Sequence, residues 1–286
     1  MRFEFKSHCF EFPSDHCVLF GILNITPDSF SDGGKFFSSE KALEHALQLE
    51  KDGADVVDIG GESSRPGATP IPAECEMERI LPVIQLLKCH LQIPISVDTT
   101  KAIVAEAALS AGAHIINDIS GLAADPQMAS VVTSSGAGLI LMHHRGFLVA
   151  SQPPHPHQHV VEEVKCELLD RYRFALSVGI PQERIALDPG IGFAKTPEQN
   201  LVLLRNLKAF TMGGANAQPF VNCPMMIGVS RKSFLGGKVT ERALGTLVAE
   251  IWAYQQGVRI IRTHDVAAIR RAIGTFLAIQ NTCNEK

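Results

Sequence analysis

The 286-residue sequence lacks several features that would assign a protein to a broad class. No apolar run approaches the roughly 20 residues that a membrane-spanning helix needs, so we expect no membrane partner. The net charge of −4 is small and mixed in sign, which indicates no nucleic-acid partner. The first residues, MRFEFKSHCF, alternate apolar and polar side chains and contain no continuous apolar segment of the kind a signal peptide has.

Cysteine pairs and nucleotide-binding motifs are also missing. Seven cysteines, an odd number, occur without any C-x-x-C pair, which is typical of reduced thiols in a cytoplasmic protein and not of disulfides or zinc sites. No Gly-Lys-Ser/Thr follows Gly33-Gly34, so this loop is not a phosphate-binding P-loop. Three alternating histidines in the Pro-rich segment 144–159 are interpreted as exposed polar sequence and not as a metal site.

The sequence does contain a regular alternation of short apolar segments and helical patterns. The eight apolar segments are 18–23, 54–59, 93–97, 113–116, 138–142, 185–187, 225–229 and 259–261. Strict alternation of this kind predicts a parallel sheet, and eight units in this length are typical of a (β/α)8 TIM barrel. An open, doubly wound sheet is the alternative. We predict one α/β domain, a barrel over residues 18–282, after an N-terminal strand or hairpin at residues 1–17.

Polar side chains stand at the carboxyl ends of at least seven predicted strands. They are Asn24, Asp58, Asp98, Asn117, Asp118, His143, Asp188, Lys232, Arg262 and His264. In a barrel these ends converge on one mouth, where the active sites of barrel enzymes lie. Helix capping explains Asp265 and is an equal alternative for Asp58 and Asp118. It does not explain Lys232 or Arg262, since cations are disfavoured at helix N-termini. These two cations need an anionic partner, either a ligand or the carboxylates themselves.

The polar residues suggest two sub-sites. Asp98, Asn117 and Asp188 offer acceptors for a flat heterocycle rich in N–H groups, because a carboxylate matches two parallel donors. Asn24, Arg262 and His264 come from the first and eighth strands, which are neighbours in a closed barrel, and they suit a phosphate or diphosphate. Asn24 and an acidic loop residue, Asp32, are candidate ligands for Mg²⁺, which takes its other ligands from phosphate and water.

Seven ordered segments, each at a predicted strand end, resemble the dihydropteroate synthase family of folate-pathway enzymes. They are GILNITPDSFSDGG (21–34), DIGGESSRPGA (58–68), SVDT (96–99), NDISG (117–121), DPGIGF (188–193), SRKSF (230–234) and RTHDV (262–266). The resemblance implies a pterin-binding barrel, usually dimeric, and a transferase that is the target of sulfonamides. Its reaction would join 6-hydroxymethyl-7,8-dihydropterin diphosphate to p-aminobenzoate and release pyrophosphate.

The resemblance also implies roles for individual residues. The pterin grip would consist of Asp98, Asn117, Asp188 and Lys232, with Ile119 and Met142 packing on the ring. Asn24, Arg262 and His264 would bind the diphosphate, with Mg²⁺ held by Asn24 and Asp32. The p-aminobenzoate side would consist of Phe30, Ser64, Arg65, Pro66, Phe193 and Ser233. Asp98, Asp188, Lys232 and Arg262 would be catalytic in a dissociative route, which needs positioning and electrostatic stabilisation but no activated nucleophile. Residues 26–34 would form a lid.

Three departures from the family pattern concern the site. Ser64 replaces the common Thr, and Ala194 replaces a Gly, which is harmless if its φ is negative and strained if it is positive. His144-Arg145 adds a potential charge beside the pterin site. Two alternative functions remain: a folate-dependent methyltransferase acting on a corrinoid protein, and a non-catalytic pterin-binding paralogue. Arg262, His264 and the first loop argue against the former. The intact loops 24–34 and 60–67 argue against the latter, although the changes at 143–145 keep it open.

Overall fold

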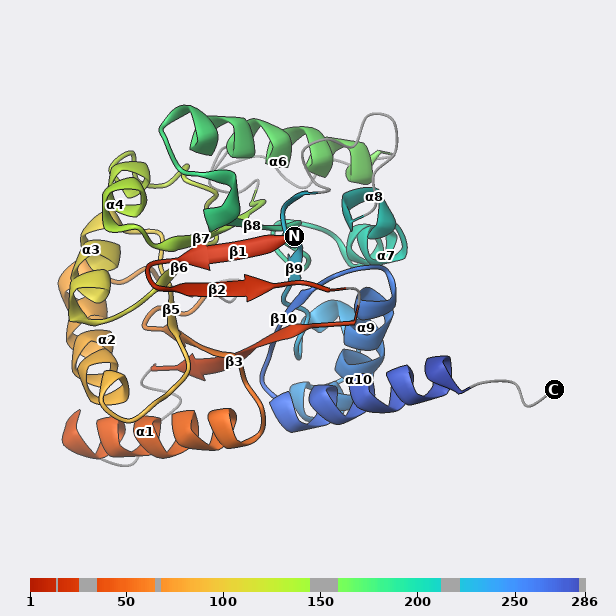
Figure 1. Cartoon of the computed structure of the whole chain (residues 1–286), viewed down its shortest axis with the longest axis horizontal. Helices are drawn as coiled ribbons and strands as arrows, with labels where there is room; N and C mark the ends of the chain where they lie inside the picture. The colour runs from red at the N-terminus through yellow and green to blue at the C-terminus, as the bar shows by residue number, and fades with distance from the viewer. Residues whose placement is uncertain (14, 26–34, 65–67, 145–158, 212–221, 283–286) are drawn as a thin grey trace.

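Eight parallel strands form the wall of a barrel in the computed structural model, which describes residues 1–13, 15–25, 35–64, 68–144, 159–211 and 222–282 (Figure 1). In chain order they are β3 (Val18–Asn24), β4 (Val56–Gly60), β5 (Ile95–Asp98), β6 (Ile115–Asp118), β7 (Gly138–Met142), β8 (Ile185–Asp188), β9 (Met226–Ile227) and β10 (Ile260–Thr263). The hydrogen-bonded order is β8-β7-β6-β5-β4-β3-β10-β9. A parallel bridge between Leu187 and Met225 joins the two ends of this order and nearly closes the wall. The barrel prediction is therefore confirmed.

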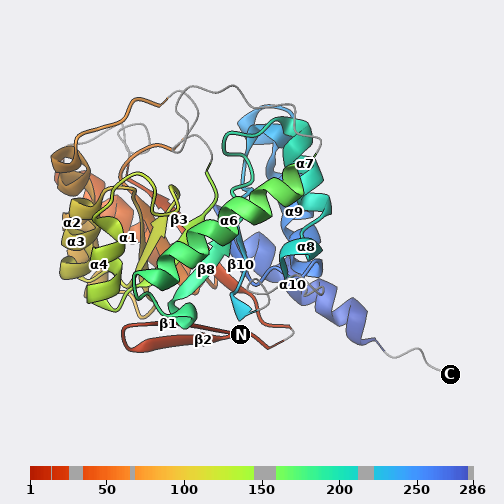
Figure 2. The ribbon, with the colours of Figure 1, turned by 90° about the horizontal axis from the view of Figure 1, so that it is seen from above.

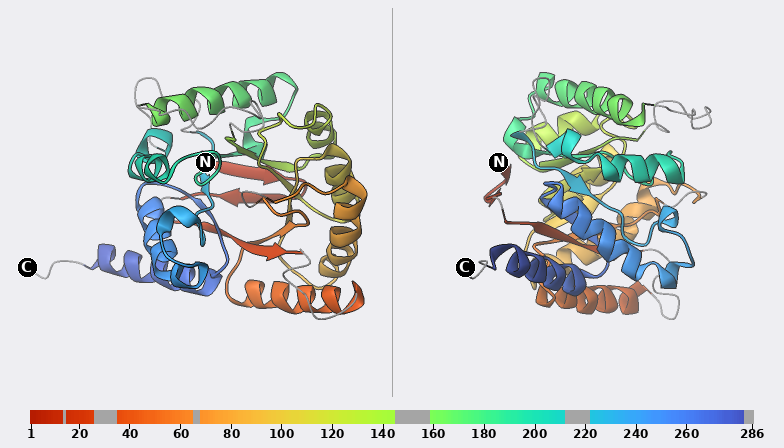
Figure 3. Two further views of the ribbon diagram at one scale, coloured as in Figure 1. Left: turned by 180° about the vertical axis from the view of Figure 1, so that it is seen from behind. Right: turned by 90° about the vertical axis from the view of Figure 1, so that its right-hand side faces the viewer.

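The helices lie outside the strands and surround the wall of the barrel (Figures 1 and 3). They are α1 (Lys35–Lys51), α2 (Ala73–Lys88), α3 (Ala102–Ala111), α4 (Met128–Ser135), α6 (Val160–Ser177), α7 (Pro197–Arg205), α8 (Lys208–Thr211), α9 (Ala243–Gln255) and α10 (Val266–Asn281), with 3-10 turns η2 (Gln182–Arg184), η4 (Ser233–Leu235) and η5 (Val239–Glu241). Asp265 caps α10 by accepting a hydrogen bond from the Ala268 amide at 3.0 Å, as predicted. None of the described helices is long and apolar enough to cross a membrane.

An N-terminal hairpin closes the amino-terminal end of the barrel (Figure 2). Its strands are β1 (Arg2–Phe5) and β2 (His8–Glu11), paired antiparallel. Phe3 and Phe5 are fully buried and pack with inward strand residues such as Phe20. A side chain at Gly138 would lie 2.9 Å from the Phe3 ring, so this close packing needs a glycine. Burying an aromatic side chain of this size contributes about 2–3 kcal/mol. The carboxyl-terminal end of the barrel is therefore the end where a ligand can bind.

The seventh strand of the wall is shorter than predicted. The apolar pattern predicted residues 225–229, whereas β9 pairs only through Met226–Ile227. Beyond it the chain turns, and the Lys232 amide donates to the Val229 carbonyl at 3.2 Å. This turn brings residues 230–232 to the mouth of the barrel earlier than a longer strand would.

Candidate active site

Arg262 follows Ile261 on β10, and its guanidinium bridges two carboxylates from neighbouring strands. Its Nε donates to Asp58 Oδ2 at 2.6 Å, and its Nη2 donates to Asp98 Oδ2 at 3.0 Å. Asn117 Nδ2 also donates to Asp58 Oδ2, at 3.3 Å. Asp58 is fully buried, and its Oδ1 has no hydrogen-bond partner among the described residues. The anionic partner that the sequence left open is, for Arg262, this pair of carboxylates.

Burial decides the protonation of this cluster. It raises the pKa of Asp98 to about 7, although the charge of Arg262 acts in the opposite direction. Burial would lower the pKa of Arg262, but the charges of Asp58 and Asp98 outweigh it and raise that pKa above its ordinary value. Near neutral pH the cluster therefore holds a permanent cation and a carboxyl group, Asp98, that can change its charge.

Asp188, which is buried, and Lys232, which is half-buried, form a second acidic and basic pair at the mouth. Burial raises the pKa of Asp188, against a 2.7 Å hydrogen bond from the Gly190 amide and the charge of Lys232. Burial lowers the pKa of Lys232 to about 7, and Asp188 opposes this shift. The Lys232 ammonium donates to the Ile191 carbonyl and lies 4.0 Å from the centre of the Phe193 ring.

Asn24 and His264 lie on adjacent strands, as the barrel closure requires. β10 pairs with β3 in parallel, with Ile260 opposite Val18. His264 Nδ1 lies 2.8 Å from Ser230 Oγ, and the His264 amide donates to the same oxygen at 3.3 Å. Asn24 is half-buried at the end of β3, and its Oδ1 lies beside Gly60, 3.4 Å from where a side chain there would begin. Arg262 comes from this edge, but its hydrogen bonds lead to Asp58 and Asp98.

A cavity of about 150 Å³ opens beside Asp98 at the mouth of the barrel. It is lined by Glu62, Ser63, Ser64, Glu76, Asp98, Thr99, Thr100, Lys101, Ile119 and His144. Its walls include Ile119, Asp98 and Ser64, which the sequence assigned to the pterin and p-aminobenzoate sides. Met142 is buried and stands opposite Asp188 in the pairing of β7 with β8.

The other residues of the predicted p-aminobenzoate side are only partly described. Ser233 is exposed, and Phe193 is half-buried beneath the Lys232 ammonium. Phe30, Arg65 and Pro66 lie outside the described residues. So do the proposed magnesium ligand Asp32 and the proposed lid, residues 26–34.

The structure shows the consequences of two of the three departures from the family pattern, those at Ala194 and at His144. Ala194 has φ +47°, a left-handed conformation that is common for glycine but rare for residues with a side chain, apart from Asn and Asp. Alanine at this position is therefore strained, which is one of the two outcomes that the sequence allowed. Burial and the charge of Lys195 lower the pKa of His144 to about 4. This imidazole is therefore neutral at neutral pH and adds no charge to the site. Arg145 lies outside the described residues.

Sequence reasoning gave no role to a network below the loop that follows β4. Lys101 Nζ donates to Glu76 Oε2 at 2.6 Å and to Glu62, and Arg79 Nη1 donates to the Gly61 carbonyl at 2.8 Å. Glu76 is fully buried. These contacts fasten the loop that carries Ser64 to α2 and to the start of α3. The only sequence signal was the acidic first turn of α2, which is ordinary for an exposed helix.

Comparison with known proteins extends over nearly the whole chain. The model of the family described as pterin binding enzyme matches residues 20–264. The dihydropteroate synthase of Bacillus subtilis is 43% identical over 268 residues, covering 92% of this chain and 89% of that protein. The corresponding protein of Synechocystis is 43% identical over 254 residues, covering 87% and 85%.

Solved structures of the same enzyme share the fold. The Xanthomonas albilineans dihydropteroate synthase with 4-aminobenzoic acid has a TM-score of 0.85 at 38% identity, covering 94% of this chain and 95% of that chain. The Burkholderia cenocepacia enzyme complexed with 7,8-dihydropteroate has a TM-score of 0.86 at 33% identity, covering 98% and 96%.

Proposed function

Since the chain belongs to the pterin-binding enzyme family and matches dihydropteroate synthases over most of its length, we propose a residue-level account of that reaction. The protein is a transferase that joins 6-hydroxymethyl-7,8-dihydropterin diphosphate to p-aminobenzoate, giving 7,8-dihydropteroate and pyrophosphate. The observation that best supports the residue roles below is the cluster of buried carboxylates around Arg262.

Asp98, Asn117 and Asp188 accept hydrogen bonds from the N–H edge of the pterin, and Lys232 completes the grip. Ile119 and Met142 pack against the ring. Asn24, Arg262 and His264 bind the diphosphate. For Arg262 this role requires that the pterin replace the guanidinium at Asp98, to which Nη2 now donates. The pterin edge offers the same parallel N–H donors as a guanidinium, so the exchange conserves hydrogen bonds.

The reaction then follows a dissociative route. The bond between the pterin methylene carbon and the diphosphate oxygen breaks, and its electron pair leaves with pyrophosphate, whose charge Arg262 and His264 stabilise. The carboxylates of Asp98 and Asp188 lower the free energy of the pterin cation that remains. The aromatic amine of p-aminobenzoate attacks this carbon and loses a proton. Ser64, Phe193 and Ser233, with Phe30, Arg65 and Pro66, hold the amine in line.

We also propose that the reaction uses Mg²⁺. Among the described residues no cluster of three or more His, Cys, Asp or Glu side chains offers a complete metal site. Mg²⁺ bound to a diphosphate needs few protein ligands, and the half-buried Asn24 amide together with Asp32 fits that requirement. The ion would neutralise charge on the departing pyrophosphate.

A second copy of the chain is the proposed partner, in the cytoplasm. Leu244, Val248 and Trp252 follow one another at intervals of four on α9, and Leu244 and Val248 are 77% and 71% exposed. Leu201 and Val202 on the adjacent α7 are also exposed, and Trp252 Nε1 donates to a carbonyl of that helix at 2.9 Å. Exposed apolar side chains on two adjacent helices are typical of a homodimer interface. Sulfonamides, as mimics of p-aminobenzoate, are the proposed inhibitors.

The test supplies purified protein with the pterin diphosphate, labelled p-aminobenzoate and Mg²⁺, and measures dihydropteroate and pyrophosphate together. We expect both products in equal amounts, and a large loss of activity with a chelator. Absence of both products would refute the assigned reaction. Formation of dihydropteroate at the same rate in chelator would refute the magnesium proposal alone.

A further inference from the structure

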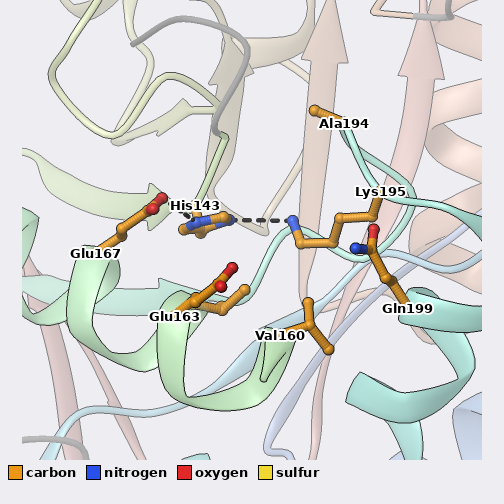
Figure 4. Close-up of a pocket in the computed structure, with 8 residues that line it drawn as sticks. His143, Val160, Glu163, Glu167, Ala194, Lys195 and Gln199 are labelled. Atoms are coloured by element: carbon orange, nitrogen blue, oxygen red, sulfur yellow. Dashed lines mark hydrogen bonds and ion pairs between the residues drawn. The ribbon is translucent and has the colours of Figure 1, made fainter. Parts of the chain in front are cut away.

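Glu167, His143 and Lys195 form a chain of side chains that links α6, the end of β7 and the segment before α7 (Figure 4). Glu167 Oε2 lies 2.8 Å from His143 Nε2, and Lys195 Nζ lies 3.0 Å from His143 Nδ1. The imidazole is buried between its two partners. None of these three residues has a role in the proposed reaction.

The hydrogen-bond donors around His143 determine which ring nitrogen carries the hydrogen. An ammonium group only donates hydrogen bonds, so His143 Nδ1 accepts from Lys195. The ring hydrogen therefore stands on Nε2 and is donated to the Glu167 carboxylate. The same ammonium also donates to the Gly190 carbonyl at 2.8 Å and to the Phe193 carbonyl at 3.1 Å. Lys195, oriented by His143, thus holds two carbonyls of segment 190–194 at once.

Segment 190–194 has a backbone that needs such support. Gly190, Gly192 and Ala194 all have positive φ, +65°, +87° and +47°. The alanine lacks the freedom of glycine, and a residue in this conformation persists only where surrounding contacts impose it. Gly190 lies against β7 so closely that a side chain there would meet the His143 carbonyl at 1.9 Å.

This segment shapes the boundary between the two proposed substrates. Its Ile191 carbonyl accepts a hydrogen bond from Lys232, and its Phe193 ring lies 4.0 Å from the Lys232 ammonium. Lys195 donates to the carbonyl of Phe193 itself, so loss of this contact moves first the Phe193 ring, which borders the p-aminobenzoate side.

We propose that Glu167, His143 and Lys195 are positioning residues for the p-aminobenzoate half of the reaction. The ammonium of Lys195, held by His143 and Glu167, keeps the Phe193 ring where an aromatic amine must stack. This inference rests on the proposed function. It assigns the three residues no contact with a substrate.

Two matched pairs of substitutions test the proposal. Lys195→Met removes the ammonium and keeps most of the length of the side chain, whereas Lys195→Arg keeps a cation that can reach the carbonyls. His143→Gln keeps a donor at the position of Nε2 and loses the acceptor toward Lys195, whereas His143→Asn keeps an acceptor at the position of Nδ1. Steady-state kinetics with each substrate varied separately give kcat and both KM values for the four variants.

Loss of a hydrogen bond to a charged group corresponds to about tenfold or more in an equilibrium constant. We expect Lys195→Met and His143→Gln to raise the KM for p-aminobenzoate by about tenfold, with the KM for the pterin diphosphate changed by less than about threefold. Lys195→Arg and His143→Asn should remain closer to the wild type. An unfolded fraction would lower the apparent kcat but leave both KM values unchanged, so the split distinguishes positioning from stability.

Amide hydrogen exchange supplies a readout that does not depend on turnover. We expect the amides of residues 191–194 to exchange at least about tenfold faster in Lys195→Met than in the wild type. An unchanged KM for p-aminobenzoate in Lys195→Met, with an active wild type, would overturn the proposal. So would equal exchange in the two proteins. A wild type without turnover would refute the proposed function instead, and the exchange comparison would still decide the role of Lys195.

Discussion

Replacing Arg262 by alanine removes the cation that compensates two buried carboxylates. The guanidinium donates to Asp58 at 2.6 Å and to Asp98 at 3.0 Å, and it is itself largely shielded from solvent. Removing one partner of a buried charge pair typically costs about 3–5 kcal/mol, because the remaining charge loses its compensation. At pH 8, above the pKa of Asp98, we expect Arg262→Ala to lower the free energy of unfolding by about 3 kcal/mol or more.

The loss should grow with pH. Burial holds the pKa of Asp98 at about 7 while Arg262 opposes it, so removing Arg262 moves this pKa above 7. A carboxyl group whose pKa is higher in the folded than in the unfolded chain binds more protons when folded, so stability falls as pH rises between the two values. In the wild type this decrease in stability ends near pH 7, the pKa of Asp98. In Arg262→Ala the stability continues to decrease above pH 7. The difference in the free energy of unfolding between the wild type and Arg262→Ala should therefore increase above pH 7 by up to about 1.4 kcal/mol per pH unit.

Urea unfolding at pH 6, 7 and 8 measures both effects. Arg262→Lys is the charge-conserving control and should lose less, since it keeps a cation without the two-pronged geometry. Adding Asp58→Asn to Arg262→Ala removes one uncompensated carboxylate and should recover part of the loss. A loss below about 1 kcal/mol at all three pH values, the size of an exposed ion pair, would refute the reasoning. A difference that stays constant above pH 7 would refute the role of Asp98 in it.

Three further predictions concern separate features. Asp188→Asn should weaken binding of a pterin at least about tenfold by calorimetry, because it removes a charged acceptor, and unchanged affinity would contradict the grip. Ala194→Gly should raise the free energy of unfolding by about 0.5–1 kcal/mol by relieving the positive φ, whereas Ala107→Gly in the interior of α3 should lower it by about 1 kcal/mol. Two losses of equal size would show that Ala194 is not strained. Val248→Asp should convert a dimer into a monomer in sedimentation experiments, while Ile103→Asp, on an exposed position of α3, should leave the dimer intact. A dimer in both variants would place the interface elsewhere.

The barrel and the edge that carries the site were predictable because they depend on local pattern and order alone. Each short apolar segment is followed by a helical pattern, and the carboxyl ends of parallel strands meet whatever fills the sequence between them. The sequence therefore brought Asp98, Asn117 and Asp188 to one mouth. It also showed that Arg262 required an anion. It did not show which one, since Asp58 and Asp98 lie 204 and 164 residues away and only the closed wall joins them.

The remaining features depend on contacts that leave no local signal. The sequence left the sign of φ at Ala194 open. It is positive, in a segment whose Gly190 and Phe193 carbonyls accept hydrogen bonds from Lys195. Glu76 occupies a helix first turn, where acidic residues usually face water, but Lys101 from the next unit covers it. The sequence suggested a potential charge at His144, but burial and the charge of Lys195 lower its pKa to about 4, so it stays neutral well below pH 7.

A single bridge, between Leu187 and Met225, forms one joint of the wall, whereas the other joints of the wall have two to five residue pairs each. Here β9 contributes two paired residues on its other side, and the Leu187 amide reaches the Pro224 carbonyl at 3.0 Å. Asp188 stands directly after Leu187 on one side of this joint, and Lys232 follows β9 on the other. A pterin held by both residues would span the joint and act as a cross-link between its two sides. Binding of the pterin would then also help to close the barrel, and the wall would gain rigidity at this single bridge.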